Sequence, residues 1–319
     1  MRLLALKVDV DTWRGTQEGV PRLVALLQGA RAGGTFLFSL GPDRTGRAIR
    51  RVLRPGFMSK VSRTSVLEHY GVRTLLYGTL LPGPDIGRRG ASLLRGVRDA
   101  GFETGIHCWD HVRWQDFVAR RDARWTETEM RAAVNRYAEV FGVAPRTHGA
   151  AGWQMNEHAY RLERLLGFDY ASDGRGTHPY RPALQGREIG VPQLPTTLPT
   201  FDELIGLDGV TAGNVDRRLL ELSEAAPPFG HVFTLHAELE GMKLAPAFQR
   251  LLSGWQRQGY RAVSTRSLFE SLGPDPLPLH EIAVGQVPGR SAELALQGVR
   301  VGEQGAGNRP DAGTAEVVR

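Results

Sequence analysis

The sequence predicts an α/β fold in which parallel strands alternate with helices. Apolar segments of strand length, over 3–11, 35–40 and 102–109, alternate with amphipathic segments of helical length, over 20–32 and 86–100. This order is typical of βαβ units, which build a parallel sheet or a barrel. Acids and histidines also follow several strands, as they do where a β/α barrel has its active site. The 319 residues are enough for one large domain with a buried core.

The first predicted strand ends in two acids, Asp9 and Asp11. Side chains alternate along a strand, so both carboxylates are expected on the same face. Burying an unpaired carboxylate costs free energy, which indicates that a bound cation lies beside the two acids. One acid would then bind the cation, and the other could act as a general base. An acidic strand end that caps the next segment is the alternative. A loop, a helix, a strand and a turn are expected next, over 12–19, 20–32, 35–40 and 41–43.

Residues 44–81 form a basic segment. Its first thirty residues contain eight Arg or Lys and a single acid, Glu68, and apolar residues are interleaved with them. This pattern is typical of a stretch that lies on an anionic membrane surface, and a solvated helix face or a nucleic-acid contact is the alternative. The predicted membrane contacts are Arg47, Arg50, Arg51 and Arg54.

Two histidines, His107 and His111, lie four residues apart at the end of the strand predicted over 102–109. Residues at this spacing share a face in a helical turn, so both imidazoles can bind one metal ion. Two independent surface histidines are the alternative. A metal site needs a further ligand, which the acids after the first strand offer.

The rest of the chain continues the alternation of strands and helices. Asp173 follows a strand that begins at 168, and His236 ends a strand that begins at 231, although a lone histidine is more often structural. Pro-punctuated residues 191–200 predict a groove-lining edge. The other expected elements are a helix over 126–141, a short strand and glycine-rich loop over 144–153, a helix over 245–258 and a strand over 260–264.

Composition sets the remaining limits. Residues 273–319 are rich in Gly, Gln, Glu and Arg, which predicts a disordered tail after a catalytic domain over 1–272. The only cysteine, Cys108, cannot form an intramolecular disulfide and indicates a reducing compartment. We expect no signal peptide and no membrane span. The net charge of +6 suits an anionic partner, and a non-enzymatic basic protein that binds membranes or nucleic acid is the alternative of another class.

These residues resemble the motifs of the polysaccharide deacetylase family, which is the NodB-homology fold or carbohydrate esterase family 4. The resemblance covers about residues 3–270 and implies a distorted (β/α) barrel with fewer than eight strands. The third motif, usually Arg-x-Pro, is poorly kept, because 150–153 differ and only Arg146 lies nearby. The other four motifs correspond, in chain order, to Asp9–Asp11, His107–His111, Ser172–Asp173 and Thr234–His236.

The resemblance also implies roles for the site residues. Asp11, His107 and His111 would bind a divalent metal, with zinc first and manganese or cobalt as alternatives. Asp9 would be the general base, and His236 the general acid, with Asp173 orienting or charge-tuning it. An exchange of Asp9 and Asp11 stays open, because the family usually has adjacent acids. Further substrate contacts are expected from Arg14, Arg146, Trp153 and Glu238.

One branch of the family resembles the chain over longer runs. This branch implies removal of formyl from undecaprenyl-phosphate-linked 4-deoxy-4-formamido-L-arabinose, in the aminoarabinose modification of lipid A and polymyxin resistance. The enzyme would be peripheral, on the anionic cytoplasmic face of the bacterial inner membrane, and nucleic acid is not an expected partner. A metal-dependent N-deacetylase of another sugar is the alternative. The runs are Val8–Thr16, Ser39–Asp43, His107–His111, Ala150–Trp153, Leu194–Thr200 and His236–Gly241.

Overall fold

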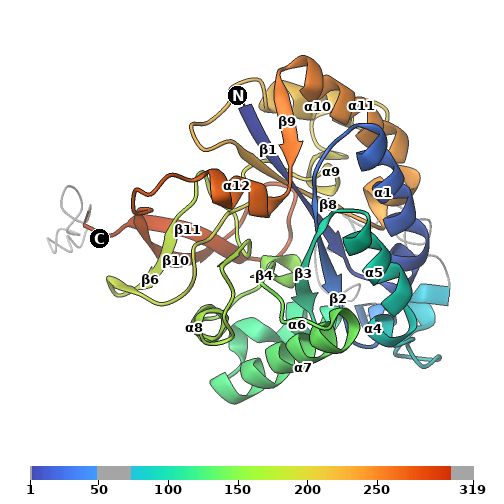
Figure 1. Ribbon diagram of the computed structural model, residues 1–319, viewed down its shortest axis with the longest axis vertical. Coiled ribbons are helices and arrows are strands. Elements are labelled where there is room, and N and C mark those ends of the chain that lie inside the picture. The colour runs from blue at the N-terminus through green and yellow to red at the C-terminus, as the bar shows by residue number, and fades with distance from the viewer. Residues whose placement is uncertain (1, 49–72, 303–319) are drawn as a thin grey trace, which may run out of the picture.

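A parallel sheet of seven strands lies at the centre of the computed structural model, which describes residues 2–48 and 73–302 (Figure 1). The strand order is β5-β4-β3-β2-β1-β8, and β9 also pairs with β1. The predicted distorted barrel with fewer than eight strands is therefore confirmed. The strands are β1 (Arg2–Val10), β2 (Thr35–Ser39), β3 (Glu103–Cys108), β4 (Thr147–His148), β5 (Tyr170–Ala171), β8 (His231–His236) and β9 (Tyr260–Val263).

Strand β1 is the centre of the sheet. It is buried from Leu4 to Val10, as expected of a parallel strand that is covered on both faces. It pairs with β2 on one side and with β8 on the other, and β9 pairs with its first residues. In this register Asp9 lies next to His236. The sheet itself therefore places residues from opposite ends of the chain side by side.

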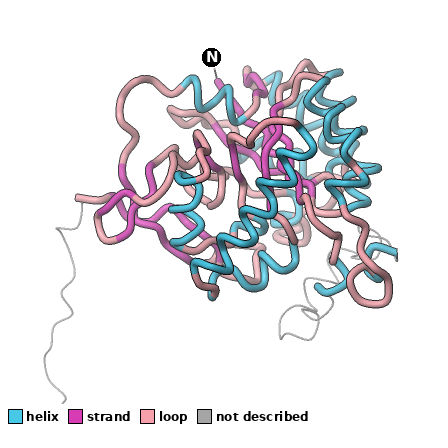
Figure 2. The backbone as a smooth tube through the Cα atoms, turned by 60° about the horizontal axis from the view of Figure 1, so that its bottom comes forward, coloured by secondary structure: helices cyan, strands magenta, loops and turns pink. Residues whose placement is uncertain are grey.

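Helices pack against the strands of the first sheet, and in the tube drawing they lie mainly to the right and in front of those strands (Figure 2). The helix predicted over 86–100 is divided at Gly90, and the one predicted from 126 begins earlier because Asp122 caps it by accepting a hydrogen bond from the Trp125 N–H. The helices are η1 (Gly15–Gly19), α1 (Val20–Gly29), α4 (Ile86–Arg89), α5 (Ala91–Asp99), α6 (His111–Phe117), η3 (Val118–Arg120), α7 (Ala123–Phe141), η4 (Ala151–Trp153), α8 (Glu157–Leu165), α9 (Phe201–Leu204), α10 (Val215–Leu222), η5 (Leu239–Lys243), α11 (Ala245–Arg257) and α12 (Thr265–Ser271).

A second sheet of four strands lies beside the first, in the order β11-β10-β6-β7 (Figure 1). The prediction of a disordered tail from 273 is wrong for its first part, because β10 pairs in parallel with β6 and antiparallel with β11. Two of the β11 side chains, Leu294 and Ala295, are buried. Residues 303–319 lie outside the described part of the chain. The strands are β6 (Arg181–Leu184), β7 (Arg187–Glu188), β10 (Leu279–Gly285) and β11 (Leu294–Arg300).

Most of the basic segment lies outside the described residues, which omit 49–72 and with them Arg50, Arg51 and Arg54. Its two described flanks meet, because the Gly46 N–H donates to the Tyr77 carbonyl over 3.0 Å. Arg47 is exposed, and its Nε donates to the Gly78 carbonyl over 3.0 Å. Membrane contact by this segment therefore stays a prediction.

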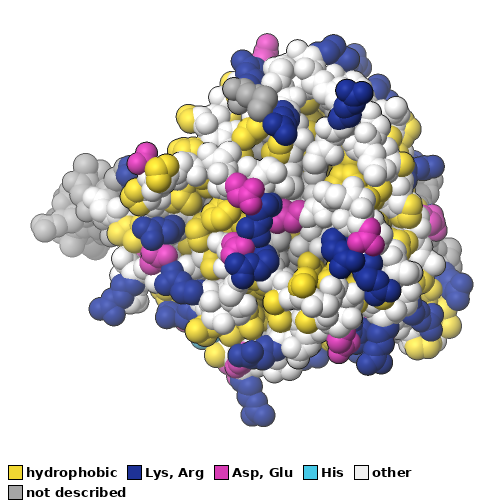
Figure 3. All heavy atoms as spheres, in the orientation of Figure 1, with side chains coloured by type: hydrophobic (Ala, Val, Ile, Leu, Met, Phe, Trp, Pro, Cys, Tyr) yellow, Lys and Arg dark blue, Asp and Glu magenta, His cyan; other side chains and the backbone are white. Residues whose placement is uncertain are grey.

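The surface of the described part gives no single basic face in the view drawn. Lys and Arg side chains are dispersed over it and in several places lie next to Asp or Glu (Figure 3). Among the described helices, none is both long and apolar enough to cross a bilayer.

Candidate metal centre and active site

Four predicted site residues meet at the carboxyl ends of neighbouring strands. Asp9 belongs to the end of β1 and Asp11 follows it, while His107 lies near the end of β3 and His236 ends β8. All four are buried or nearly so, although each carries a polar or charged group. Because parallel strands end at the same edge of the sheet, residues far apart in sequence form one cluster there.

The donor atoms of Asp11, His107 and His111 converge. Asp11 Oδ1 lies 3.2 Å from His107 Nε2 and 3.4 Å from His111 Nε2. Ligand atoms about 2.0–2.1 Å from a tetrahedral zinc lie about 3.3 Å from one another, so these separations match those of a metal site. Asp11 Oδ1 is buried and has no hydrogen-bond partner among the described residues, as expected of an oxygen that binds a cation. The three residues therefore fit a divalent metal.

The two histidines are held by neighbouring backbone. His107 Nδ1 donates to the Gly149 carbonyl over 2.7 Å, which leaves the Nε2 lone pair directed towards Asp11. His111 is the first residue of α6, which Asp110 caps by accepting a hydrogen bond from the Arg113 N–H. The expectation of one helical turn is therefore wrong, because the two histidines lie on a strand end and on the start of the next helix.

Electrostatics keep Asp11 ionised. Burial alone would raise the pKa of its carboxyl, but His111 and His107 outweigh burial and hold that pKa far below its usual value. A carboxylate must be deprotonated to bind a metal, so this environment suits a ligand.

Asp9 has a buried partner that the sequence interpretation missed. The fully buried Lys7 places Nζ 3.6 Å from Asp9 Oδ2 and donates a hydrogen bond to the Ser172 carbonyl over 2.8 Å. The ring of Trp153 lies 5.5 Å from the same Nζ. Lys7 and Asp9 are two residues apart on β1 and share a face, and a lysine within an apolar strand was the available signal.

His236 is buried with acids around it. Its backbone N–H donates to Glu240 Oε2 over 2.7 Å, and its Nδ1 has no hydrogen-bond partner. Burial would lower the pKa of the His236 imidazole, but Asp202, Asp11 and Glu240 outweigh burial and raise it above the usual value. This environment favours a protonated imidazole, as a general acid requires.

Asp173 does not have the contact that was expected of it. In the described structure it does not reach His236: Asp173 Oδ1 lies 2.8 Å from His148 Nδ1 and accepts a hydrogen bond from the Ala150 N–H over 2.9 Å. Glu163 Oε1 lies 2.8 Å from the same His148 nitrogen. Asp173 thus supports the loop whose Gly149 carbonyl orients His107. The negative charge near His236 comes instead from Asp202, Asp11 and Glu240.

The expected substrate residues divide between the two ends of the sheet. Glu238 is buried beside the candidate metal ligands, where its Oε1 accepts hydrogen bonds from the backbone N–H groups of Asp11 and Thr12. Arg14 comes shortly after Asp11 and Thr12 in the sequence, and its side chain and that of Glu238 line the same cavity. Trp153 is buried in the wall behind Lys7, and its Nε1 donates to Thr196 Oγ1 over 3.2 Å.

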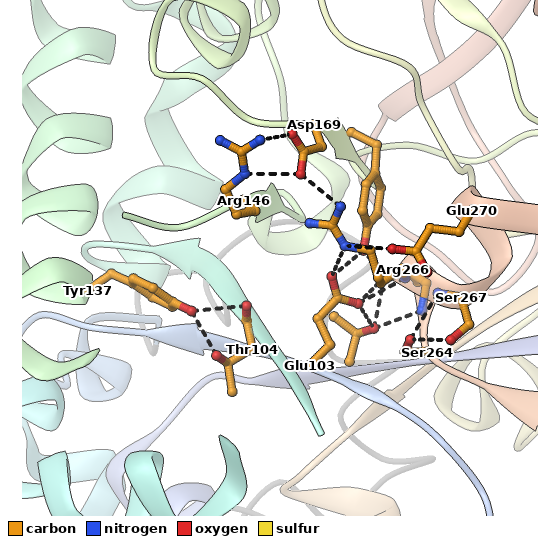
Figure 4. A network of polar contacts seen from close by, with 12 residues as sticks. Glu103, Thr104, Tyr137, Arg146, Asp169, Ser264, Arg266, Ser267 and Glu270 are labelled. Carbon is orange, nitrogen blue, oxygen red and sulfur yellow. Dashed lines mark hydrogen bonds and ion pairs between the residues drawn. The ribbon is translucent and has the colours of Figure 1, made fainter. Parts of the chain in front are cut away.

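Arg146 lies at the other end. It precedes β4 and pairs with Asp169, which also pairs with Arg266 (Figure 4). The same network contains Glu103, the first residue of β3, and so lies at the amino end of the strands. Arg146 therefore lies away from the cluster at the carboxyl ends of the strands, because it comes before its strand and not after it, and its contact with substrate stays a prediction.

Two curated relatives match almost the whole chain, although no protein-family model matches it. A probable 4-deoxy-4-formamido-L-arabinose-phosphoundecaprenol deformylase from Shewanella sediminis is 34% identical over 302 residues, which cover 94% of this chain and 96% of the relative. A relative of the same name from Wigglesworthia glossinidia brevipalpis is 30% identical over 284 residues, which cover 89% of this chain and 98% of the relative.

Solved structures share the fold at low sequence identity. A Mycobacterium smegmatis protein named for polysaccharide deacetylase activity has a TM-score of 0.55 at 16% identity, covering 86% of this chain and 94% of its own. A pseudoenzyme of carbohydrate esterase family 4 from Bacillus anthracis has a TM-score of 0.51 at 11% identity, covering 88% of this chain and 69% of its own. By sequence, the chain belongs to the 4-deoxy-4-formamido-L-arabinose-phosphoundecaprenol deformylases, which are hydrolases of carbon–nitrogen bonds, and it has the polysaccharide deacetylase fold.

Proposed function

We propose that this protein is a metal-dependent deformylase of undecaprenyl-phosphate-linked 4-deoxy-4-formamido-L-arabinose. The observation that carries the proposal is the convergence of Asp11 Oδ1 with the Nε2 atoms of His107 and His111, at 3.2 and 3.4 Å. Two imidazoles and one carboxylate suit zinc, and manganese or cobalt are alternatives. The names of the two relatives support this substrate.

Hydrolysis of the formamide would use the cation and two side chains, Asp9 and His236. A divalent cation held by Asp11, His107 and His111 would supply Lewis-acid chemistry at the formyl group and lower the pKa of water. Asp9 lies beside the ligands and takes the proton of the attacking water. His236 lies next to Asp9 in the β1–β8 register and protonates the amine nitrogen as the carbon–nitrogen bond breaks. The products are formate and a primary amine on the sugar.

The lipid of the substrate stays in the membrane, so the protein must work at a bilayer surface. We place it peripherally on the cytoplasmic face of the inner membrane, where the amine it produces serves the aminoarabinose modification of lipid A and resistance to polymyxin. The basic composition of 44–81 supports attachment to anionic lipid.

The proposal is tested by measuring metal content and formate release together. His107→Ala and His111→Ala are expected to lose bound metal and turnover of the lipid-linked formamido sugar, while circular dichroism shows that the fold remains. Loss of a group that merely supports a ligand already costs about 10–100-fold, and loss of a ligand should cost at least as much. His158→Ala, a half-buried histidine on α8, is the matched control. Full turnover by the metal-free His107→Ala/His111→Ala variant would refute the proposal.

A further inference from the structure

A basic cavity lies beside the metal centre. It has a volume of about 370 Å³, in the range of small-ligand sites, and lies between the helical segment that follows β1 and the segment that follows β8. Three cationic residues line it against two acids. The lining residues are Arg14, Glu18, Arg22, Glu238, Gly241, Met242 and Lys243.

The arrangement of charge in this cavity favours an anion. Arg14, Glu18 and Arg22 follow one another at four-residue spacing, and so lie on one helical face. Glu18 accepts from Arg14 over 3.2 Å, and Glu238 Oε1 already accepts hydrogen bonds from Asp11 and Thr12. Arg14 and Glu18 thus balance each other, and Arg22 and Lys243 outnumber the remaining acid, Glu238, so the cavity keeps an excess of positive charge.

Glu238 connects the cavity with the reaction centre. Its Oε1 accepts from the Asp11 N–H over 3.1 Å, so the cavity begins one side chain away from a metal ligand. Two glycines keep the segments this close: a Cβ on Gly15 would meet Glu238 Oε1 at 2.0 Å, and one on Gly241 would meet the Gly19 carbonyl at 2.7 Å. The cavity is therefore a fixed part of the active-site end of the sheet.

We infer that this cavity binds the phosphate diester that joins the sugar to its lipid. The inference rests on the proposed function, in which one sugar ring separates the formamide from the phosphate. With the formyl group at the metal centre, the phosphate must bind about one ring away, where Arg14, Arg22 and Lys243 provide donors for its oxygens. Arginine forks and a lysine ammonium are the usual partners of phosphate.

A binding measurement on the full chain tests this inference directly. The probe is a water-soluble methyl diester of a short prenyl phosphate, titrated by calorimetry. Arg22→Gln/Lys243→Gln is expected to weaken binding by about tenfold or more, since each charge-assisted hydrogen bond contributes about that factor or more. Glutamine keeps a donor for the Met242 carbonyl, to which Arg22 Nη1 donates. Arg217→Gln/Arg257→Gln, on exposed positions of α10 and α11, removes the same charge elsewhere and should leave binding unchanged.

Turnover separates this inference from the proposed function. The cavity variant should have a raised KM for the phosphate-linked sugar and an unchanged kcat/KM for the methyl glycoside of the same formamido sugar, which has no phosphate. Failure of the wild-type protein to deformylate either compound would count against the proposed function, while calorimetry still decides on the cavity. No binding of the diester, equal binding by the cavity variant, or equal affinity for inorganic phosphate would overturn the inference.

Discussion

Lys7 offers a sharp test of how this site is built. Its side chain is 0% exposed, and Nζ lies between the Ser172 carbonyl at 2.8 Å and Asp9 Oδ2 at 3.6 Å. Lys7→Met has a similar shape and no charge, so it leaves a buried carboxylate without its cation. Removal of one partner from a buried ion pair costs about 3–5 kcal/mol, and we expect that loss in the free energy of unfolding.

The same substitution should affect catalysis in a specific way. Lys7 cannot touch substrate because it is fully buried, so KM should stay unchanged. Asp9 should lose its fixed position, and a misplacement of about 1 Å in a reacting group can cost about 10²-fold. We therefore expect kcat to fall by about that factor, with bound metal retained.

A double-mutant cycle separates stability from catalysis. Urea unfolding of Lys7→Met, Asp9→Asn and the double variant is compared in the presence of a chelator. The double variant should recover much of the lost stability, because both members of the pair are then neutral, but it should stay inactive without its base. Additive losses of stability, or a kcat of Lys7→Met within twofold of wild type, would refute the positioning role of Lys7.

Three further predictions concern other parts of the chain. His236→Ala should keep its metal and lose about 10²–10⁴-fold in kcat, because proton transfer to the leaving amine contributes that much; loss of metal in this variant would instead make His236 a ligand. Stability should fall as pH rises above 7: burial would lower the pKa of His148, but Asp173 and Glu163 raise it to about 10. The protonated His148 therefore stabilises the fold fully below its unfolded pKa of about 6.5, and this contribution is lost by about 10, at up to about 1.4 kcal/mol per pH unit. Urea unfolding of His148→Gln at pH 7, 8 and 9 should show a weaker dependence, and an unchanged slope would contradict the assignment. Replacement of the predicted membrane contacts by Glu should reduce binding to anionic vesicles, and the replaced residues are Arg47, Arg50, Arg51 and Arg54. It should slow turnover of the lipid-linked substrate and spare a water-soluble analogue. Normal vesicle binding by this variant would exclude the segment as the membrane anchor.

Local patterns predicted much of the framework. Apolar runs over β1, β2, β3 and β8 locate the strands, and the rule that parallel strands end at one edge brings Asp9, His107 and His236 together. The position of Asp11 between two imidazole nitrogens depends on the turn after β1 and on the start of α6. The distances from Asp11 Oδ1 to the two imidazole nitrogens therefore cannot be predicted from hydrophobic periodicity.

The errors share one physical cause, which is pairing between distant segments. Asp173 binds His148, 25 residues before it, because two short strands and the loops after them pack together. Residues 279–300 looked too polar to fold, but β10 finds its partner in β6, about 100 residues earlier. In both cases the partner is distant in sequence, so the composition of a short stretch of residues does not reveal it.

The position of β1 in the sheet has a consequence for synthesis on the ribosome. Its pairing with β2 can form early, but its other neighbours, β8 and β9, are encoded about 220 residues or more downstream. At ~5–20 residues per second, one edge of this strand stays unpaired for roughly 10–45 seconds during translation. An exposed apolar edge is prone to aggregation, so newly made chains should depend on chaperones throughout that interval. Synonymous codons that slow translation between 40 and 230 should therefore lower the soluble yield without altering any residue of the mature protein.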